Sequence, residues 1–274
     1  MRSSGKKAGQ KAGRKGIYLL PNLFTSASLF GGFYAIIASI QGRYEAAAIA
    51  ILISTLFDGL DGKIARLTNT TSDFGTEYDS LSDLVAFGIA PSILAFQLAL
   101  APFGRLGWLA SFTYVVCGAL RLARFNVQKD TIDAKDFKGL PTPAAASFVA
   151  SFVLFTTVIG GFSESKNIVI ILLIYILSFL MVCNIRYPSF KEFDLKRQKS
   201  FNALVAIILV FLVIAYKPKV MLFIVLTVYI LWGPFFALCR LKKKGAMAKA
   251  HFKQTRPVEV TDDLERADNG GVVR

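Results

Sequence analysis

Apolar stretches dominate the chain and are separated by short polar segments. Eight stretches are each near the length that a helix needs to cross a bilayer. They lie at residues 17–40, 44–65, 76–100, 105–125, 141–161, 167–185, 201–216 and 219–239. The pattern predicts an all-α fold, a polytopic bundle of about eight transmembrane helices in which the seventh span is the shortest.

The composition supports a membrane protein with one transmembrane domain. Hydrophobic residues make up 54% of the chain, and the mean hydropathy is +0.52. No long polar linker divides residues 17–240, so we expect a single domain there. A basic segment, residues 1–16, precedes it, and a polar tail, residues 241–274, follows it. Their compositions predict disorder at both ends.

The basic residues predict the orientation of the bundle. With the amino terminus in the cytoplasm, 27 of the 32 Lys and Arg residues fall in cytoplasmic segments. The other five are Arg43, Arg105, Lys166, Lys217 and Lys219. Positive residues favour the cytoplasmic side, so both termini and the turn near residue 70 are expected there. This distribution, with no nucleic-acid-binding motif beside it, argues against a nucleic-acid partner despite the net charge of +14.

Four aspartates near the second and third spans are the strongest candidates for chemistry. Asp58 and Asp61 are three residues apart, and Asp79 and Asp83 are four apart, so each pair shares a helical face. The polar segment 67–74 between the pairs predicts a turn. Two antiparallel helices joined there would bring the four carboxylates together.

Such a group of carboxylates predicts a metal site. Each aspartate in mid-membrane costs about 2.5–3.5 kcal/mol, so four without a partner would cost roughly 10 kcal/mol. Oxygen-only ligand sets favour hard cations such as Mg²⁺, Mn²⁺ or Ca²⁺. The alternative is a solvated acidic turn at the membrane surface, which explains neither the spacing nor the glycines between the acids.

These residues carry a resemblance. The segment from Asp58 to Asp83 has the pattern D-x2-D-G-x2-A-R-x8-G-x3-D-x3-D and resembles the CDP-alcohol phosphatidyltransferase family at every fixed position. Four further segments resemble the bacterial integral-membrane branch that uses L-serine. They are Leu20–Thr25, Gly118–Asn126, Phe137–Ala144 and Ile185–Phe190.

The resemblance implies an activity and its partners. The donor would be CDP-diacylglycerol, the acceptor L-serine, and the products phosphatidylserine and CMP. The protein would lie in the cytoplasmic (inner) membrane, with its active site on the cytoplasmic side, and would form a homodimer. Asp58, Asp61 and Asp79 would hold one or two Mg²⁺ or Mn²⁺ ions. Asp83 would share the metal and act as the base.

The resemblance also implies substrate contacts, several of which have a structural alternative. Gly62 would allow close approach of the cytidine, and Arg66 would contact phosphate. Weaker candidates for the CDP group are Asn22, Thr25 and Ser72, which could equally be turn or cap residues. Arg121 and Arg124, three residues apart, could hold the serine carboxylate or only anchor the helix at the membrane surface. Lys138 and Arg186 are further candidates.

Two other functions remain open at this point. A sister enzyme of the same family would transfer the phosphatidyl group to glycerol phosphate or inositol phosphate. A cation channel or transporter would use the carboxylates as an ion site. A transporter site is expected near the midplane of the membrane, whereas these acids lie towards one predicted face.

Overall fold

The computed structural model describes residues 19–68, 72–128, 137–160, 168–187 and 216–235. The chain divides into two compact units, Met1–Gly233 and Pro234–Arg274, and the described residues of the second are 234 and 235. The expected amino-terminal segment 1–16, residues 201–215 of the expected seventh span and the tail 241–274 lie outside the described residues.

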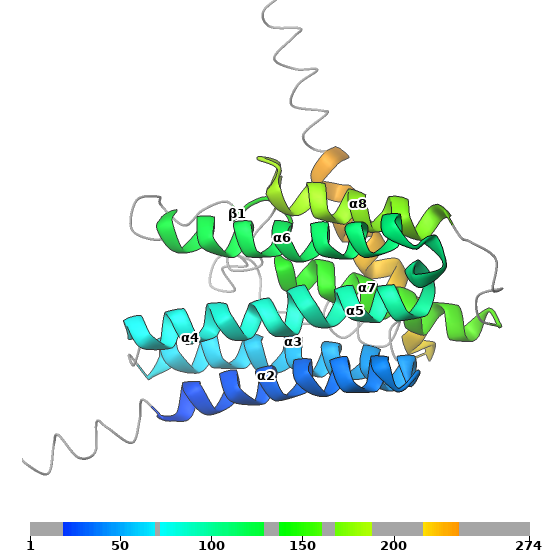
Figure 1. Ribbon diagram of the computed structural model, residues 1–274. Helices are drawn as coiled ribbons and strands as arrows, with labels where there is room; N and C mark the ends of the chain where they lie inside the picture. Colours follow the sequence, from blue (N-terminus) through cyan, green and yellow to red (C-terminus); the bar gives the residue numbers. More distant parts are fainter. Residues whose placement is uncertain (1–18, 69–71, 129–136, 161–167, 188–215, 236–274) are drawn as a thin grey trace, which may run out of the picture. The chain divides into compact units, whose positions relative to one another are not determined.

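The described part of the first unit is built from helices (Figure 1). A nearly continuous helical run from Asp73 to Phe103 consists of α4 (Asp73–Asp83), the π-helical η1 (Leu84–Ile89), α5 (Ala90–Ala95), the π-helical η2 (Phe96–Leu100) and the 3-10 turn η3 (Ala101–Phe103). The other labelled helices are α2 (Leu19–Ile40), α3 (Tyr44–Leu67), α6 (Arg105–Gln128), α7 (Thr142–Val158) and α8 (Ile168–Val182). A further helix spans Pro218–Phe235.

Several of these helices have the length and apolarity of membrane spans. Within the described residues there are four, Leu20–Ile40, Asp73–Phe103, Arg105–Gln128 and Pro218–Phe235. The helices α7 and α8 are apolar but shorter, with 17 and 15 residues. The helix α3 has 24 residues, but Asp58, Asp61, Lys63 and Arg66 lie in its last ten. The prediction of a helical membrane protein is confirmed, and the count of about eight spans stays a prediction.

Small residues bring α2 close to α3 and to η1, and Figure 1 shows α2 and α3 side by side. A Cβ atom added at Gly31 would lie 2.3 Å from Ser54 Oγ, and one at Gly32 would lie 2.5 Å from Ala86 Cα. The hydroxyls of Ser28 and Ser54 each donate to the other residue's carbonyl oxygen, at 3.1 and 3.0 Å. Small residues that let backbones approach are typical of helix contacts in membranes.

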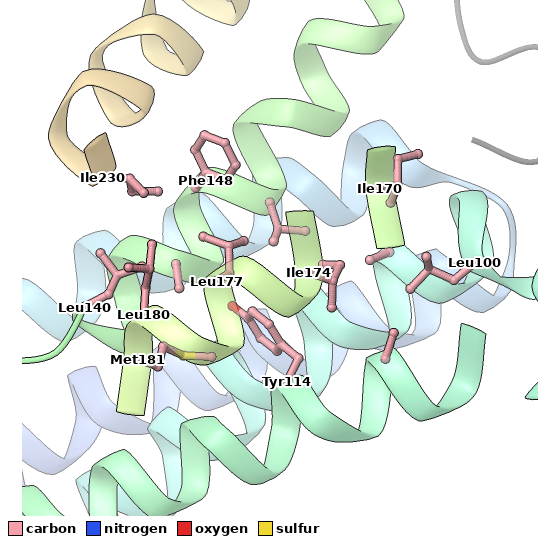
Figure 2. Close-up of a cluster of buried hydrophobic side chains, with 14 residues drawn as sticks. Leu100, Tyr114, Leu140, Phe148, Ile170, Ile174, Leu177, Leu180, Met181 and Ile230 are labelled. Atoms are coloured by element: carbon pink, nitrogen blue, oxygen red, sulfur yellow. The ribbon is translucent and has the colours of Figure 1, made fainter. Parts of the chain in front are cut away.

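Larger side chains fill a second cluster between α6 and α8 (Figure 2). Its centre includes Tyr114 of α6 and Ile174 and Leu177 of α8, which are all almost fully buried. The cluster also includes Phe148 of α7 and Ile230 of helix Pro218–Phe235. This cluster joins the later helices of the unit, while the small-residue contact joins the earlier ones.

A short antiparallel pairing connects the two polar segments that flank α7 and α8. Strand β1 (Phe137–Lys138) pairs with β2 (Arg186–Tyr187), with Lys138 opposite Arg186. The chain then turns at Gly139, whose φ of 86° is a left-handed conformation that favours glycine. The amide of Leu140 donates to the carbonyl of Leu180 at 2.8 Å. The start of α7 is thereby attached to the end of α8.

Candidate metal and substrate site

Three carboxylates meet where α3 ends and α4 begins. One carboxylate oxygen from each of Asp58, Asp61 and Asp79 lies within 4.8 Å of the other two. Asp58 and Asp61 occupy one face of the last turns of α3, and Asp79 lies on α4. The turn between the two helices was expected at residues 67–74, and α3 ends at Leu67 while α4 begins at Asp73. The helical spacing and the turn together explain why the three acids converge.

Asp83 lies beside this group of three. It is the last residue of α4, one turn after Asp79, and η1 follows it directly. Its carboxyl group is within hydrogen-bonding reach of the Asp58 carboxyl and interacts electrostatically with Asp79 and Asp61. The four aspartates therefore form one acidic site, in which the three with oxygens within 4.8 Å of one another are Asp58, Asp61 and Asp79.

Residues of α2 hold the acidic site from one side. The buried hydroxyl of Thr25 donates to Asp61 Oδ2 at 2.9 Å and also lies 3.2 Å from the Pro21 carbonyl oxygen. Ser82 of α4 donates to the carbonyl oxygen of Thr25 at 3.1 Å. The beginning of α2 thus contacts both helices that carry the carboxylates. Thr25 was expected as a nucleotide contact, and the structure places it against a metal-ligand candidate.

Two more hydrogen bonds fix α4, and sequence reasoning had missed them. The hydroxyls of Ser26 and Tyr78 lie 2.8 Å apart and join α2 to α4. Asn126 Nδ2 of α6 donates to Ser80 Oγ at 2.9 Å. Asn126 belongs to the segment Gly118–Asn126 that resembles the serine-using branch, so the sequence marked this segment. The sequence did not indicate that Ser80 is the partner of Asn126.

The glycines at the end of α3 differ from those in the middle of α2. A Cβ atom added at Gly59 or Gly62 would meet no described atom within 4 Å, and both residues are exposed. Packing within the described part of the protein therefore does not require glycine at either position. The side chain of Arg66, expected nearby as a phosphate contact, lies outside what the structure describes.

The two remaining candidates for the CDP group lie near the start of α4. Ser72 is the N-cap of α4, and its hydroxyl accepts a hydrogen bond from Gly75 N at 3.0 Å. The structure thus gives Ser72 the cap role that was the alternative to substrate binding. The Asn22 Oδ1 atom of α2 would lie 3.4 Å from a Cβ atom added at Gly75. Asn22 is therefore close to the same turn.

The two arginines of α6 take different directions. Arg121 is 9% exposed, and its Nη1 donates to Thr142 Oγ1 at 3.0 Å. It interacts electrostatically with Asp83 and with Tyr229 of helix Pro218–Phe235. Arg124 Nη1 donates to the Val182 carbonyl oxygen at 3.3 Å, and its Nη2 donates to the Asn184 side chain. Arg121 thus extends towards the acidic site, while Arg124 binds the end of α8.

Comparison with known proteins assigns the family. A family model described as CDP-alcohol phosphatidyltransferase matches residues 18–182, more than half of the chain. The chain belongs to the CDP-alcohol phosphatidyltransferase family. The matched range contains all four aspartates, both arginines of α6 and Thr142. The family prediction made from the aspartate pattern is confirmed.

Curated members of the family extend the similarity beyond that range. The chain is 40% identical over 217 residues to a CDP-diacylglycerol–serine O-phosphatidyltransferase of Helicobacter pylori, covering 79% of this chain and 90% of the relative. It is 35% identical to the protein of the same name from Bacillus subtilis, covering 63% of this chain and 92% of the relative. It is also 40% identical to an archaetidylserine synthase of Methanothermobacter thermautotrophicus, covering 62% of this chain and 69% of the relative.

The donor set of this family member fits a hard divalent cation. Three carboxylates with oxygens within 4.8 Å offer the negative charge and the oxygen ligands that Mg²⁺ and Mn²⁺ prefer. The hydrogen bond from the Thr25 hydroxyl to Asp61 Oδ2 orients the Asp61 carboxylate, as hydrogen bonds to metal ligands commonly do. Without a cation the carboxylates would repel one another in a partly buried site.

Proposed function

We propose that this protein transfers the phosphatidyl group of CDP-diacylglycerol to the hydroxyl of L-serine, in a reaction that depends on a divalent metal. The products are phosphatidylserine and CMP. The names of the relatives from Helicobacter pylori and Bacillus subtilis support the substrates. The convergence of Asp58, Asp61 and Asp79 is the observation that carries the mechanism, because a pyrophosphate donor needs its charge neutralised.

Asp58, Asp61 and Asp79 would hold one or two Mg²⁺ or Mn²⁺ ions, with Asp83 sharing them. A bound divalent cation supplies charge neutralisation at the pyrophosphate of the donor. Thr25 keeps the Asp61 carboxylate in one orientation through its 2.9 Å hydrogen bond. The hydrogen bonds of Ser26 of α2 and Asn126 of α6 to α4 fix the helix that carries Asp79.

We propose that the nucleotide binds along the side of α3 that carries Gly59 and Gly62. At Gly59 and Gly62 no described atom lies within 4 Å of an added Cβ position, so a flat pyrimidine could approach the backbone closely there. Arg66 is the candidate for a phosphate oxygen, where its planar guanidinium group is well suited. Asn22 and Ser72, at the neighbouring turn, are the weaker candidates for the rest of the CDP group.

The chemical step is a substitution at the phosphorus that carries the diacylglycerol. The serine hydroxyl oxygen forms a new bond to this phosphorus, and the bond from phosphorus to the oxygen of CMP breaks, so that CMP leaves with the electron pair. Asp83 accepts the hydroxyl proton as general base. Asp83 is not one of the three acids whose oxygens lie within 4.8 Å of one another, but it is within reach of Asp58, which supports a role distinct from that of those three carboxylates.

Arg121 is the candidate for binding the carboxylate of serine. Its guanidinium group is almost fully buried, and its Nε atom has no hydrogen-bond partner among the described residues. A buried donor without a partner is costly, and a substrate carboxylate would satisfy it. Arg124 is the weaker candidate, because its Nη atoms already bind the end of α8.

We also propose the predicted membrane orientation, with the site on the cytoplasmic side of the inner membrane. The beginning of α2, the end of α3 and the beginning of α4 meet at the acidic site, and the ends of α6 and α8 are joined by Arg124. The predicted cytoplasmic segments adjoin these helix ends. Impermeant cysteine labelling at position 69 from outside intact cells would contradict this orientation. The homodimer implied by the family resemblance also belongs to this proposal.

The alternatives differ in what they bind. The sister enzymes would release CMP with glycerol phosphate or inositol phosphate as acceptor, and the names of the relatives favour serine. A cation channel or transporter would not bind CDP-diacylglycerol saturably. Membership of the family favours an enzyme over a channel or a transporter.

One assay tests the proposed function. The purified protein is incubated with CDP-diacylglycerol, Mg²⁺ or Mn²⁺, and one of L-serine, glycerol phosphate or inositol phosphate. We expect CMP release and phosphatidylserine formation with L-serine, and loss of both with excess chelator. CMP release with another acceptor and none with serine would contradict the proposed acceptor, and full activity in chelator would contradict the proposed metal.

A further inference from the structure

Among the described residues, one side chain, that of Thr142, hydrogen-bonds the buried guanidinium group of Arg121. Its Nη1 donates to Thr142 Oγ1 at 3.0 Å, while Nε has no hydrogen-bond partner in the described part of the chain. Within the same part, no carboxylate lies within ion-pairing distance of Arg121, although Asp83 attracts it electrostatically. Arg121 is a long, flexible cation close to the acidic site, yet it forms no ion pair with the described aspartates.

Thr142 is buried, and its backbone is restricted by its neighbours. It is 1% exposed and is the first residue of α7, between Pro141 and Pro143, whose rings restrict the backbone. Its Cγ2 methyl lies 3.7 Å from the place where a Cβ atom on Gly118 would be, and Gly88 Cα of η1 is nearly as close to that place. The methyl group therefore packs where α6, α7 and η1 meet, which leaves the hydroxyl pointed at Arg121.

We infer that Thr142 is a positioning residue for the acceptor: its hydroxyl holds Arg121 away from Asp83 and leaves the other N–H groups of the guanidinium free for the carboxylate of an amino-acid acceptor. The inference rests on the proposed function and deepens it. Two consequences follow for the reaction. Asp83 stays available for the hydroxyl proton, and the acceptor carboxylate is bound at a fixed distance from the hydroxyl that reacts.

Substitutions at position 142 can separate this role from packing. Thr142→Val keeps the shape of the side chain and removes the oxygen that accepts from Arg121, whereas Thr142→Ser keeps the oxygen and removes the methyl group. The matched control is Thr156→Val. Thr156 is equally buried on α7, and its hydroxyl donates to the Val153 carbonyl oxygen of its own helix.

Steady-state kinetics with CDP-diacylglycerol and L-serine give the readout. Losing a hydrogen bond to a charged group should raise the KM for serine roughly ten- to a hundred-fold in Thr142→Val, with the KM for CDP-diacylglycerol nearly unchanged. Thr142→Ser should restore most of the serine affinity, and Thr156→Val should leave both constants unchanged. Thermal unfolding in detergent shows that each variant is folded.

A double-mutant cycle tests the route through Arg121. In an Arg121→Ala background, Thr142→Val should have no further effect on the KM for serine. An equal rise in the KM values of both substrates, an undiminished effect in the Arg121→Ala background, or a normal serine KM in Thr142→Val would each overturn the inference. A wild-type protein that does not use serine at all would instead contradict the proposed function, so the two failures are distinguishable.

Discussion

The middle of the α2–α3 pair and its carboxylate end use glycine in opposite ways. In the middle, neighbouring atoms occupy the space beside Gly31 and Gly32. An added Cβ atom would lie 2.3 Å from Ser54 Oγ at Gly31 and 2.5 Å from Ala86 Cα at Gly32. At the end of α3, Gly59 and Gly62 face space in which an added Cβ atom would meet no described atom within 4 Å. The first pair serves packing, and the second pair is left open.

The polar groups of the two regions differ in the same way. Ser28 and Ser54, in the middle, satisfy each other with two reciprocal hydrogen bonds. At the carboxylate end, Thr25 provides one hydrogen bond to Asp61, and one oxygen from each of three acids lies within 4.8 Å of the other two. The middle joins helices to one another, whereas the carboxylate end gathers negative charge that the proposed metal would neutralise. Substitutions in the two regions should therefore change different properties.

The largest effect is expected from the carboxylates. Asp58→Asn, Asp61→Asn or Asp79→Asn should each lower kcat at least roughly a hundred-fold, because a bound metal is worth several kcal/mol in the transition state. Thermal stability should be kept or raised, since one of several repelling charges is removed. CMP release and unfolding temperature in detergent measure the two effects. Asp73→Asn, an exposed acid at the start of the same α4, is the control and should keep near-normal activity. Near-normal turnover in the three site variants would contradict the assignment of these aspartates as metal ligands.

The next effect concerns the hydrogen bond behind the metal ligands. Thr25→Val should raise the metal concentration needed for half-maximal activity about 10–100-fold, with much of kcat recovered at saturating metal. Titration with Mg²⁺ or Mn²⁺ measures this. Ser39→Ala is the control, because Ser39 is buried on the same helix and its hydroxyl donates to Ala35 of that helix. An unchanged metal requirement in Thr25→Val would mean that the hydrogen bond only supports packing.

A packing glycine should affect stability. Gly32→Ala should lower the free energy of unfolding by about 1–3 kcal/mol, because α2 and η1 must separate to admit a methyl group 2.5 Å from Ala86 Cα. The loss should occur although alanine favours a helix over glycine by about 1 kcal/mol. Thermal or denaturant unfolding in detergent measures it. A variant as stable as the wild type would show that the contact can relax and would weaken the contrast between the two glycine pairs.

The smallest effect is expected at an open glycine. Gly62→Ala should leave the protein as stable as before, or more stable by up to about 1 kcal/mol. The KM for CDP-diacylglycerol should rise a few-fold, with the KM for serine unchanged, because the methyl group enters space proposed for the nucleotide. Parallel kinetics and unfolding curves for Gly62→Ala and Gly32→Ala give the direct contrast. If Gly62→Ala loses stability instead, the open side of α3 is a protein contact.

Some features of the candidate site could be predicted from residue spacing. The spacing of Asp58 and Asp61, and of Asp79, predicted that carboxylates from two helices would meet, and one oxygen of each lies within 4.8 Å of the others. The same reasoning placed Arg121 and Arg124 on one face of a helix. Their Cα atoms do share that face, but their guanidinium groups bind different partners, Thr142 and the end of α8. Long side chains reach neighbours that spacing along one helix does not reveal.

The sequence by itself determined the class of the protein, the order and approximate bounds of most described helices, and the group of acids. These follow from local periodicity and spacing, which depend on residues close together in the chain. The family came from the resemblance of the residue pattern from Asp58 to Asp83 to known proteins. Only the tertiary structure decided that Gly32 is packed while Gly62 is open, that Thr25 supports Asp61, and that Thr142 holds Arg121. Each of these depends on contacts between residues far apart in the sequence, whose partners no periodic pattern specifies.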